Sequence, residues 1–241
     1  MTSLPAVNDG ICLYAIGDIH GHTATLRQLL GEVLRDAKQH PNEVKRLVFL
    51  GDYIDRGPDS RGVIDLLLHD LPHDYEVVFL RGNHEDVALR VMEGESDLIE
   101  SWMQFGGGAF FSSYGVDPFR PRIMETPEIL RMELQLNLPA EHRGFLEQTS
   151  LSHICGDYYF AHAGVRPGVP LDKQEADDLL WIRDEFIHSG QDFGKIVVHG
   201  HSIKPEPDVQ HNRIGIDTGA FESGRLTCLK LVGTERTFLS T

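Results

Sequence analysis

Long apolar runs are missing from this chain of 241 residues, and no stretch approaches the ~20 consecutive apolar residues needed to cross a bilayer. The first residues, Met1–Asn8, have neither a basic patch nor an apolar core, so we expect no signal peptide. Cysteine is scarce, and its three copies lie far apart without CxxC spacing: Cys12, Cys155 and Cys228. A disulfide framework is therefore not expected, and a reducing, cytoplasmic setting is predicted.

Positive charge is also in short supply. Lysine and arginine number 22 against 37 aspartates and glutamates, which gives a formal net charge of −15. This balance disfavours binding to nucleic acid or to an anionic membrane, and we predict neither as a partner. An anionic substrate must then be attracted by metal ions and a few arginines. Histidine is abundant, with 13 copies, and we expect solvated surface positions for His40, His69, His73, His142 and His188.

Three short apolar runs each lead into a glycine-flanked polar loop. Tyr14–Ile16 precedes Gly17-Asp18-Ile19-His20-Gly21, Arg46–Phe49 precedes Gly51-Asp52-Tyr53-Ile54-Asp55-Arg56-Gly57, and Val77–Leu80 precedes Arg81-Gly82-Asn83-His84-Glu85. Each run is typical of a buried strand. Carboxylates concentrated in this way repel one another unless a cation lies between them. The pattern predicts one shared metal site at one edge of a sheet.

The segments between these runs have helical periodicity. Apolar residues recur at helical spacing in Thr23–Lys38, and Asp59-Ser60 is a helix start ahead of Arg61–His69. Alternating strands and helices predict a layered α/β fold, which collects ligands at the carboxyl ends of its strands.

From about residue 86 to residue 150 the pattern becomes mostly helical, which predicts a helical insertion within a single domain spanning residues 1–241. Ser96 is expected to cap a helix at 97–104, and Thr126-Pro127 and Pro139 are expected to begin two more.

The glycine run 106–108 predicts a flexible or tightly turned loop beside Trp102, in either a hydrophobic cap or a wall that faces the substrate. Beyond it we expect a hairpin around Gly156-Asp157, then a polar helix over 173–187. Further strands are predicted at 195–198, 213–216 and 226–231.

Six polar residues follow predicted strands: Asp18, His20, Asp52, Asn83, His162 and His201. Carboxylate, imidazole and amide ligands without thiolates suit Mn, Fe or Zn. Six ligands are too many for one catalytic ion that keeps an open position. They suit two divalent ions about 3.5–4 Å apart that share a carboxylate, and Asp52, in the middle of the set, is the expected bridge.

The blocks Gly17–Gly21, Gly51–Gly57 and Gly82–Glu85 resemble the signature blocks of the phosphoprotein phosphatases, a family of calcineurin-like metallophosphoesterases with compact bacterial and bacteriophage members. The resemblance covers roughly Ile11 to Leu231. It implies a four-layer α/β/β/α sandwich, in which helices flank a central β-sandwich.

The resemblance also implies roles for individual residues. Asp18 and His20 would hold one metal ion, Asp52 would bridge, and Asn83, His162 and His201 would hold the second. His84 would protonate the leaving alkoxide, and Asp55 would orient the His84 side chain. Arg56 and Arg183 would hold the phosphate oxygens.

Some assignments have alternatives. His199 competes with His201 for the last ligand position, and the family form, in which a small hydroxylated residue follows glycine-histidine, favours His201. Ile203 stands where other branches of the superfamily continue to a further histidine, which favours the protein-phosphatase branch. Asp217 either stabilises a turn or serves the site, and His22 lies either on the surface or behind the site.

The predicted function is hydrolysis of phosphate monoesters by a metal-activated hydroxide, with phosphoserine or phosphothreonine in a protein or peptide as the expected substrate. A symmetrical dinucleoside tetraphosphate hydrolase is the main alternative, because it resembles this family in all three blocks. Asp55 favours the phosphatase, since the tetraphosphatases often lack it. Few basic residues besides Arg81 and Arg166 are expected near the site for a longer phosphate chain. A non-catalytic metal-binding module is a remote alternative.

Two divalent metal ions are the expected cofactors, with Mn favoured over Fe or Zn. The sequence leaves the oligomeric state open, and a monomer is compatible with it.

Overall fold

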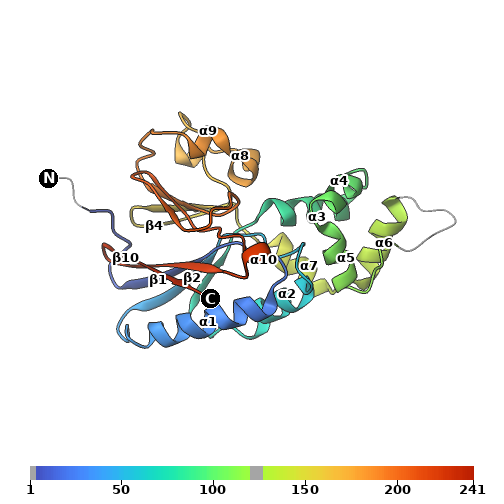
Figure 1. Ribbon diagram of the computed structural model, residues 1–241, viewed down its shortest axis with the longest axis horizontal. Helices are drawn as coiled ribbons and strands as arrows, with labels where there is room; N and C mark the ends of the chain where they lie inside the picture. The colour runs from blue at the N-terminus through green and yellow to red at the C-terminus, as the bar shows by residue number, and fades with distance from the viewer. Residues whose placement is uncertain (1–3, 120–126) are drawn as a thin grey trace.

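The computed structural model describes residues 4–119 and 127–241, and two five-stranded sheets form its centre (Figure 1). From edge to edge, the first sheet contains β10 (Glu235–Ser240), β9 (Thr227–Val232), β1 (Ile11–Ile16), β2 (Val44–Phe49) and β3 (Glu76–Phe79). The second contains β4 (Ser152–Cys155), β5 (Tyr158–Ala161), β6 (Ile196–His199), β8 (Arg213–Gly215) and β7 (Asp208–Val209). The strands β1, β2 and β3 are parallel to one another, as are β5, β6 and β8, and the remaining strands, β4, β7, β9 and β10, pair antiparallel with their neighbours.

Helices cover the outer face of each sheet and one end of the sandwich (Figure 1). The first sheet is covered by α1 (Thr23–Ala37) and α2 (Ser60–His69), and the second by α8 (Ala176–Trp181) and α9 (Asp184–Ile187). The end is occupied by α3 (Asn83–Glu93), α4 (Leu98–Gln104), α5 (Gly107–Ser113), α6 (Pro127–Asn137) and α7 (Ala140–Glu147). Two short helices, η1 (Leu171–Lys173) and α10 (Ala220–Ser223), lie in connections.

The alternation of side chains along the strands generates the layers. In β1, Tyr14 and Ile16 pack in the cluster that contains the inner faces of α1 and α2, whereas Leu13 and Ala15 pack against β5 and β6 between the sheets. In β5, Tyr159 joins a third cluster beneath α8 and α9. Because successive residues of a strand point to opposite faces, each central strand supplies two layers. The predicted four-layer α/β/β/α sandwich is confirmed.

The helical end matches the stretch predicted to be helical, and the assignment of residues 1–241 to one domain stays a prediction. The Ser96 cap is wrong, because the residue before α4 is Asp97 and no side chain caps this helix among the described residues. The glycine run turns at Gly106, with φ 102°, but Gly107 already begins α5. The helix start at Pro127 is observed, while Thr126 lies outside the described residues.

The predicted helix over 173–187 is divided into η1, α8 and α9. It breaks at Arg183, whose φ of −132° and ψ of −99° are not helical. The strands β7 and β10 were not predicted, and all six residues of β10 are exposed or half-buried, which weakens any alternating pattern.

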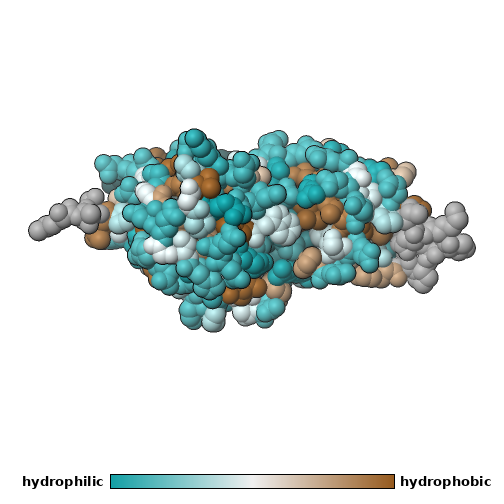
Figure 2. All heavy atoms as spheres, turned by 90° about the horizontal axis from the view of Figure 1, so that it is seen from above, coloured by the Kyte–Doolittle hydropathy of each residue, from teal (hydrophilic) through white to brown (hydrophobic). Residues whose placement is uncertain are grey.

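His142 corrects the prediction of a surface histidine, since it is 1% exposed. Its Nδ1 lies 2.8 Å from the Tyr114 hydroxyl, and its Nε2 lies 3.0 Å from an oxygen of Asp65. The face of the molecule in Figure 2 is mostly hydrophilic, with scattered apolar residues. Within residues 4–119 and 127–241, no helix is both long enough and apolar enough to span a bilayer.

Candidate active site

All six predicted ligands lie just beyond the carboxyl ends of parallel strands. Asp18 and His20 follow β1, Asp52 follows β2, Asn83 begins α3 after β3, His162 follows β5 and His201 follows β6. The sequence placed this site at the edge of one sheet. The second sheet in fact supplies two of the six residues, because the two sheets face each other and their carboxyl ends meet.

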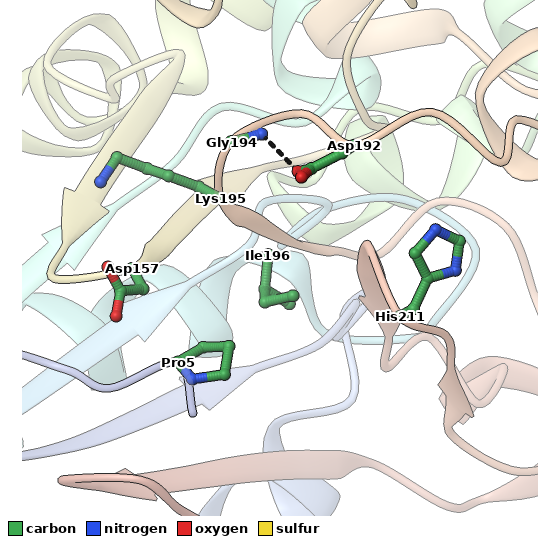
Figure 3. A pocket seen from close by; sticks show the side chains of 7 residues that line it. All are labelled: Pro5, Asp157, Asp192, Gly194, Lys195, Ile196 and His211. Carbon is green, nitrogen blue, oxygen red and sulfur yellow. Dashed lines mark hydrogen bonds between the residues drawn. The ribbon is translucent and has the colours of Figure 1, made fainter. Parts of the chain in front are cut away.

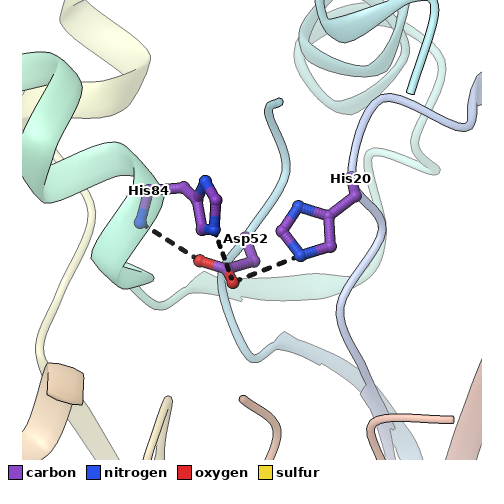
Figure 4. A group of neighbouring side chains, drawn as sticks. All are labelled: His20, Asp52 and His84. Atoms are coloured by element: carbon purple, nitrogen blue, oxygen red, sulfur yellow. Dashed lines mark hydrogen bonds and ion pairs between the residues drawn. The ribbon is translucent and has the colours of Figure 1, made fainter. Parts of the chain in front are cut away.

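Asp52 lies at the centre of the group. His20 and His84 approach its carboxylate from two sides, with His20 Nε2 3.4 Å and His84 Nε2 3.9 Å from the same oxygen, Oδ2 (Figure 4). The other oxygen, Oδ1, lies 3.4 Å from His162 Nε2 and accepts the backbone N–H of His84 at 3.3 Å. The two oxygens of Asp52 therefore face two different groups of side chains, a position from which one carboxylate can serve both groups.

The second set is closely packed and buried. His162 Nε2 lies 2.9 Å from Asn83 Oδ1 and 3.2 Å from His201 Nδ1. The ligand atoms of Asp52, His162 and His201 all lie within 4.8 Å of one another, and so do those of His20, Asp52 and His84. Asp18 contacts this group through Oδ2, which accepts the backbone N–H of His201 at 3.0 Å.

The protonation states fit metal binding. Burial lowers the pKa of His20 to about 3 and also lowers the pKa values of His162 and His201, so these imidazoles are neutral and can donate lone pairs. Burial opposes ionisation of Asp52, but the neighbouring histidines keep its pKa below the usual range. Asp18 Oδ1 is buried and has no hydrogen-bond partner among the described residues, as expected of a ligand oxygen that faces a cation site.

The loops that carry these residues have unusual backbone geometry. Five non-glycine residues in the described ranges have positive φ, and all belong to the site: His20, Asp52, Asp55, Arg56 and His201. Such conformations are rare for residues with a Cβ and cluster at functional sites. Gly82 lies so close to the second loop that a Cβ would be 2.1 Å from Asp52 Oδ1.

Glu85 holds two of these loops together, a role that sequence reasoning missed. Its side chain accepts the backbone N–H groups of Gly82, Asp52, Tyr53 and Ile54 at 2.9, 2.8, 2.8 and 3.3 Å. Burial and the charge of Asp52 raise the pKa of Glu85, while the four backbone donors, two on each oxygen, favour the ionised form. The only sequence signal was a glutamate that directly follows Asn83-His84.

His84 and Asp55 form a buried pair beside the ligands. The Nδ1–H of His84 donates to Asp55 Oδ2 at 2.5 Å, and Nε2 faces the cavity 3.4 Å from the Arg56 guanidinium. Burial lowers the pKa of His84, but Asp52 and Asp55 outweigh it and raise the value to about 9. The same Asp55 oxygen accepts the indole N–H of Trp102 at 2.6 Å.

Two arginines line the cavity above the ligands. The guanidinium of Arg56 lies 4.3 Å from the centre of the Phe221 ring, and Arg183 donates to the backbone carbonyl of His201 at 3.1 Å. The cavity has a volume of about 270 Å³. Its lining comprises Asp18, His20, Asp52, Arg56, Asn83, His84, Arg183, His201, Ile203 and Asp217. His162 lies below this lining and Asp55 lies behind His84.

The alternatives left open by the sequence differ in position. His199 packs edge-on against Phe186 on the side of α9, so the structure brings His201 and not His199 into the ligand group. Asp217 accepts the N–H of Gly219 at 2.9 Å, as a turn-stabilising residue does, and it also lines the cavity. It therefore fits both alternatives that the sequence left open. His22 lies behind the site, with its ring nitrogen 2.6 Å from the carbonyl of His20.

A larger cavity of about 490 Å³ lies at the opposite ends of the second-sheet strands (Figure 3). It is lined by Pro5, Asp157, Asp192, Gly194, Lys195, Ile196 and His211. The side chains of Lys195 and His211 point away from each other (Figure 3). No metal-ligand group among the described residues lies at this cavity. The smaller cavity is therefore the candidate active site.

This fold, with aspartates, histidines and an asparagine gathered below two arginines, defines a metallophosphoesterase. The chain belongs to the calcineurin-like phosphoesterase family, whose model matches residues 13–222. The family predicted from the three sequence blocks is thereby confirmed.

Individual relatives have different activities. The asymmetrical bis(5'-nucleosyl)-tetraphosphatase PrpE of Oceanobacillus iheyensis is 28% identical over 93% of this chain and 90% of its own length. Serine/threonine-protein phosphatase 2 of Escherichia coli is 29% identical over 91% of this chain and 92% of its own length. A crystal structure provisionally assigned as a diadenosine tetraphosphatase shares the fold with a TM-score of 0.63, at 22% identity over 99% of this chain and 98% of that chain.

Proposed function

We propose that this metallophosphoesterase is a phosphomonoesterase that removes phosphate from phosphoserine or phosphothreonine in proteins. The observation that carries the proposal is the small cavity, in which Arg56 and Arg183 are the only lysine or arginine side chains that the described residues contribute to the lining. A terminal phosphoryl group carries about two negative charges, and two arginines together with two divalent ions match it.

The ligand residues would hold two divalent cations. Asp18 and His20 would bind one, Asn83, His162 and His201 the other, and Asp52 both. Such a pair lowers the pKa of water and so supplies the nucleophile for hydrolysis. His84 remains outside this set, although Nε2 is near Asp52, because the adjacent Arg56 guanidinium disfavours a second cation at that nitrogen.

The remaining groups act on the substrate. Arg56 and Arg183 bind and orient the phosphoryl oxygens. Their electrostatic attraction to these oxygens is stronger in the partly closed site than in bulk water. His84 donates the proton on Nε2 to the ester oxygen as the bond from that oxygen to phosphorus breaks. Water supplies the new oxygen on phosphorus and one proton that restores His84, so the products are the alcohol and inorganic phosphate. Asp55 holds the His84 ring through Nδ1 during this exchange.

The two basic residues that the sequence offered for a longer polyphosphate, Arg81 and Arg166, are engaged elsewhere. Arg81 donates to the Thr149 side chain at 3.1 Å and to the Glu147 carbonyl at 3.3 Å. Arg166 forms ion pairs with Asp178 and Glu185 at 2.5 and 2.6 Å. Neither lines the cavity above the ligands, which supports the monoester.

A second candidate, hydrolysis of a dinucleoside tetraphosphate, is favoured by an adjoining cavity. This space of about 180 Å³ shares Arg56, Asn83, His84 and Arg183 with the first. Its wall includes the rings of Phe105 and Trp181, which are 60% and 40% exposed. Exposed rings beside a phosphate site can stack on a base, and PrpE is named for this activity.

A comparison of kcat/KM with Mn²⁺ tests the proposal. We expect a phosphothreonine or phosphoserine peptide to exceed diadenosine tetraphosphate, and Trp181→Ala to change the peptide rate by less than about threefold. Trp181→Phe, which retains a ring, is the control. If diadenosine tetraphosphate is tenfold better and Trp181→Ala alone abolishes that preference, the second candidate replaces the first.

A further inference from the structure

Trp102 has an unusual position for a core tryptophan. It lies on α4 in the helical end of the molecule, is 2% exposed, and packs against the rings of Phe110 and Phe111. Ring packing alone requires no polar atom. Its indole N–H nevertheless donates at 2.6 Å to Asp55, which is 47 residues away in the sequence.

The acceptor of this bond is the same oxygen that holds the acid. Asp55 Oδ2 receives the indole N–H of Trp102 and the Nδ1–H of His84, whereas Oδ1 is buried and has no hydrogen-bond partner in the described part of the chain. Two donors on one oxygen fix the orientation of the carboxylate. Without the indole, Asp55 would be free to rotate and present the other oxygen, or to lose its alignment with His84.

We propose that Trp102 is a positioning residue for the general acid, acting through Asp55 on His84. This inference rests on the proposed role of His84 as the proton donor. The hydrogen-bonded pair of His84 and Asp55 becomes a chain of three side chains with Trp102. The helical end of the molecule thereby takes part in catalysis.

The turn between α4 and α5 supports this arrangement. A Cβ on Gly107 would lie 2.6 Å from the indole of Trp102, so only glycine lets α5 approach so closely. The carbonyl of the preceding Gly106 accepts the backbone N–H of Arg56 at 3.1 Å. One turn thus contacts both the phosphate-binding arginine and the residue that orients the acid.

The decisive variant is Trp102→Phe, which retains an aromatic ring and removes the N–H. An acid matters for alkyl leaving groups and little for 4-nitrophenolate, which leaves without protonation. We expect kcat/KM for a phosphoserine peptide to fall about tenfold, the scale of one hydrogen bond to a charged group, and that for 4-nitrophenyl phosphate to change less than about threefold. Gly107→Ala, which displaces the indole without removing its N–H, should change the ratio of the two rates in the same direction.

Phe110→Leu is the matched control, because Phe110 contacts the indole but has no polar group. It should lower the melting temperature without changing the ratio of the two rates. If Trp102→Phe lowers both rates equally, or if Phe110→Leu changes the ratio as strongly, Trp102 has only a packing role and the inference is overturned.

The variant His84→Asn separates this inference from the proposed function. It should reduce the peptide rate by ~10²–10⁴ and the aryl rate much less. Adding Trp102→Phe to it should cause no further loss, because the indole acts through His84. Equal losses of both rates in His84→Asn would overturn the acid itself. A selective loss in His84→Asn, with a further tenfold loss in the double variant, would overturn only the role of Trp102.

Discussion

Replacement of Glu85 by glutamine should destabilise the fold far more than the exchange of one oxygen for an NH₂ group suggests. The carboxylate accepts four backbone N–H groups, two on each oxygen: Gly82 and Asp52 on Oε2, and Tyr53 and Ile54 on Oε1. A glutamine side chain has one oxygen and one NH₂ group. In either orientation, two buried N–H donors would face another donor.

The magnitude follows from this count. Each buried donor without an acceptor costs about 1–3 kcal/mol, so two of them cost about 2–6 kcal/mol. Removing a buried negative charge beside Asp52 offsets part of this cost, which places our expectation at the lower end, about 2–3 kcal/mol. Such a loss is a large fraction of the 5–15 kcal/mol that typically stabilises a domain.

Urea unfolding of the metal-free protein, followed by circular dichroism, is the appropriate assay because it excludes any effect of lost cations. Glu93→Gln is the control, since Glu93 lies on the same helix, α3, and is exposed. It should change the free energy of unfolding by less than about 0.5 kcal/mol. If Glu85→Gln is as stable as this control, the four hydrogen bonds do not hold the loops as we argue.

Three further predictions concern metal, substrate and pH. Asp52→Asn should lose most of about two equivalents of metal measured by elemental analysis, because its two oxygens face both ligand sets. Arg56→Ala should raise KM and lower kcat together in steady-state assays, since the guanidinium binds phosphoryl oxygens in both ground and transition states. Asp36 is partly buried, which opposes ionisation, but hydrogen bonds from Tyr14 and Lys230 lower its pKa. Asp36→Asn should therefore be less stable than the parent protein at pH 7, and this difference in unfolding free energy should shrink below about pH 4.

Each of these predictions has a contrary outcome. A fully active parent protein with one equivalent of metal would contradict the shared site. A change in KM alone for Arg56→Ala would limit the arginine to ground-state binding. The sign of the pH effect follows from a folded pKa below the unfolded one, so its stabilisation is present above the unfolded pKa and lost as pH falls through the folded value. An undiminished difference at pH 3 would show that the Asp36 charge is not the cause.

The sequence was informative where chemistry and local pattern coincide. The loops after β1, β2 and β3 could be recognised because buried strands and glycine-flanked polar residues are short-range signals. The hairpin of β4 and β5 was predicted from Gly156-Asp157 for the same reason. The six candidate ligands are indeed brought together, although their binding of metal stays a prediction.

The errors and omissions concern contacts between distant segments. His142 lies among polar neighbours in the sequence, and only the packing of α7 on Tyr114 and Asp65 buries it. Trp102 has the same local pattern as any core aromatic residue, and its bond to Asp55 exists only because α4 folds over the site. The break at Arg183 could not be predicted from helical periodicity. The side chain of Arg183 donates to the carbonyl of His201, which is distant in the sequence and follows β6.

Five non-glycine residues of the site have positive φ angles in the described part of the chain, and this backbone geometry has a consequence for the evolution of the protein. Each of these conformations costs a residue with a Cβ roughly 1 kcal/mol, which glycine would avoid. Replacement of Arg56 by glycine should thus relieve backbone strain while removing a functional group. A laboratory population selected only for heat resistance is expected to accumulate glycine at position 56, whereas selection for turnover would retain the strained arginine.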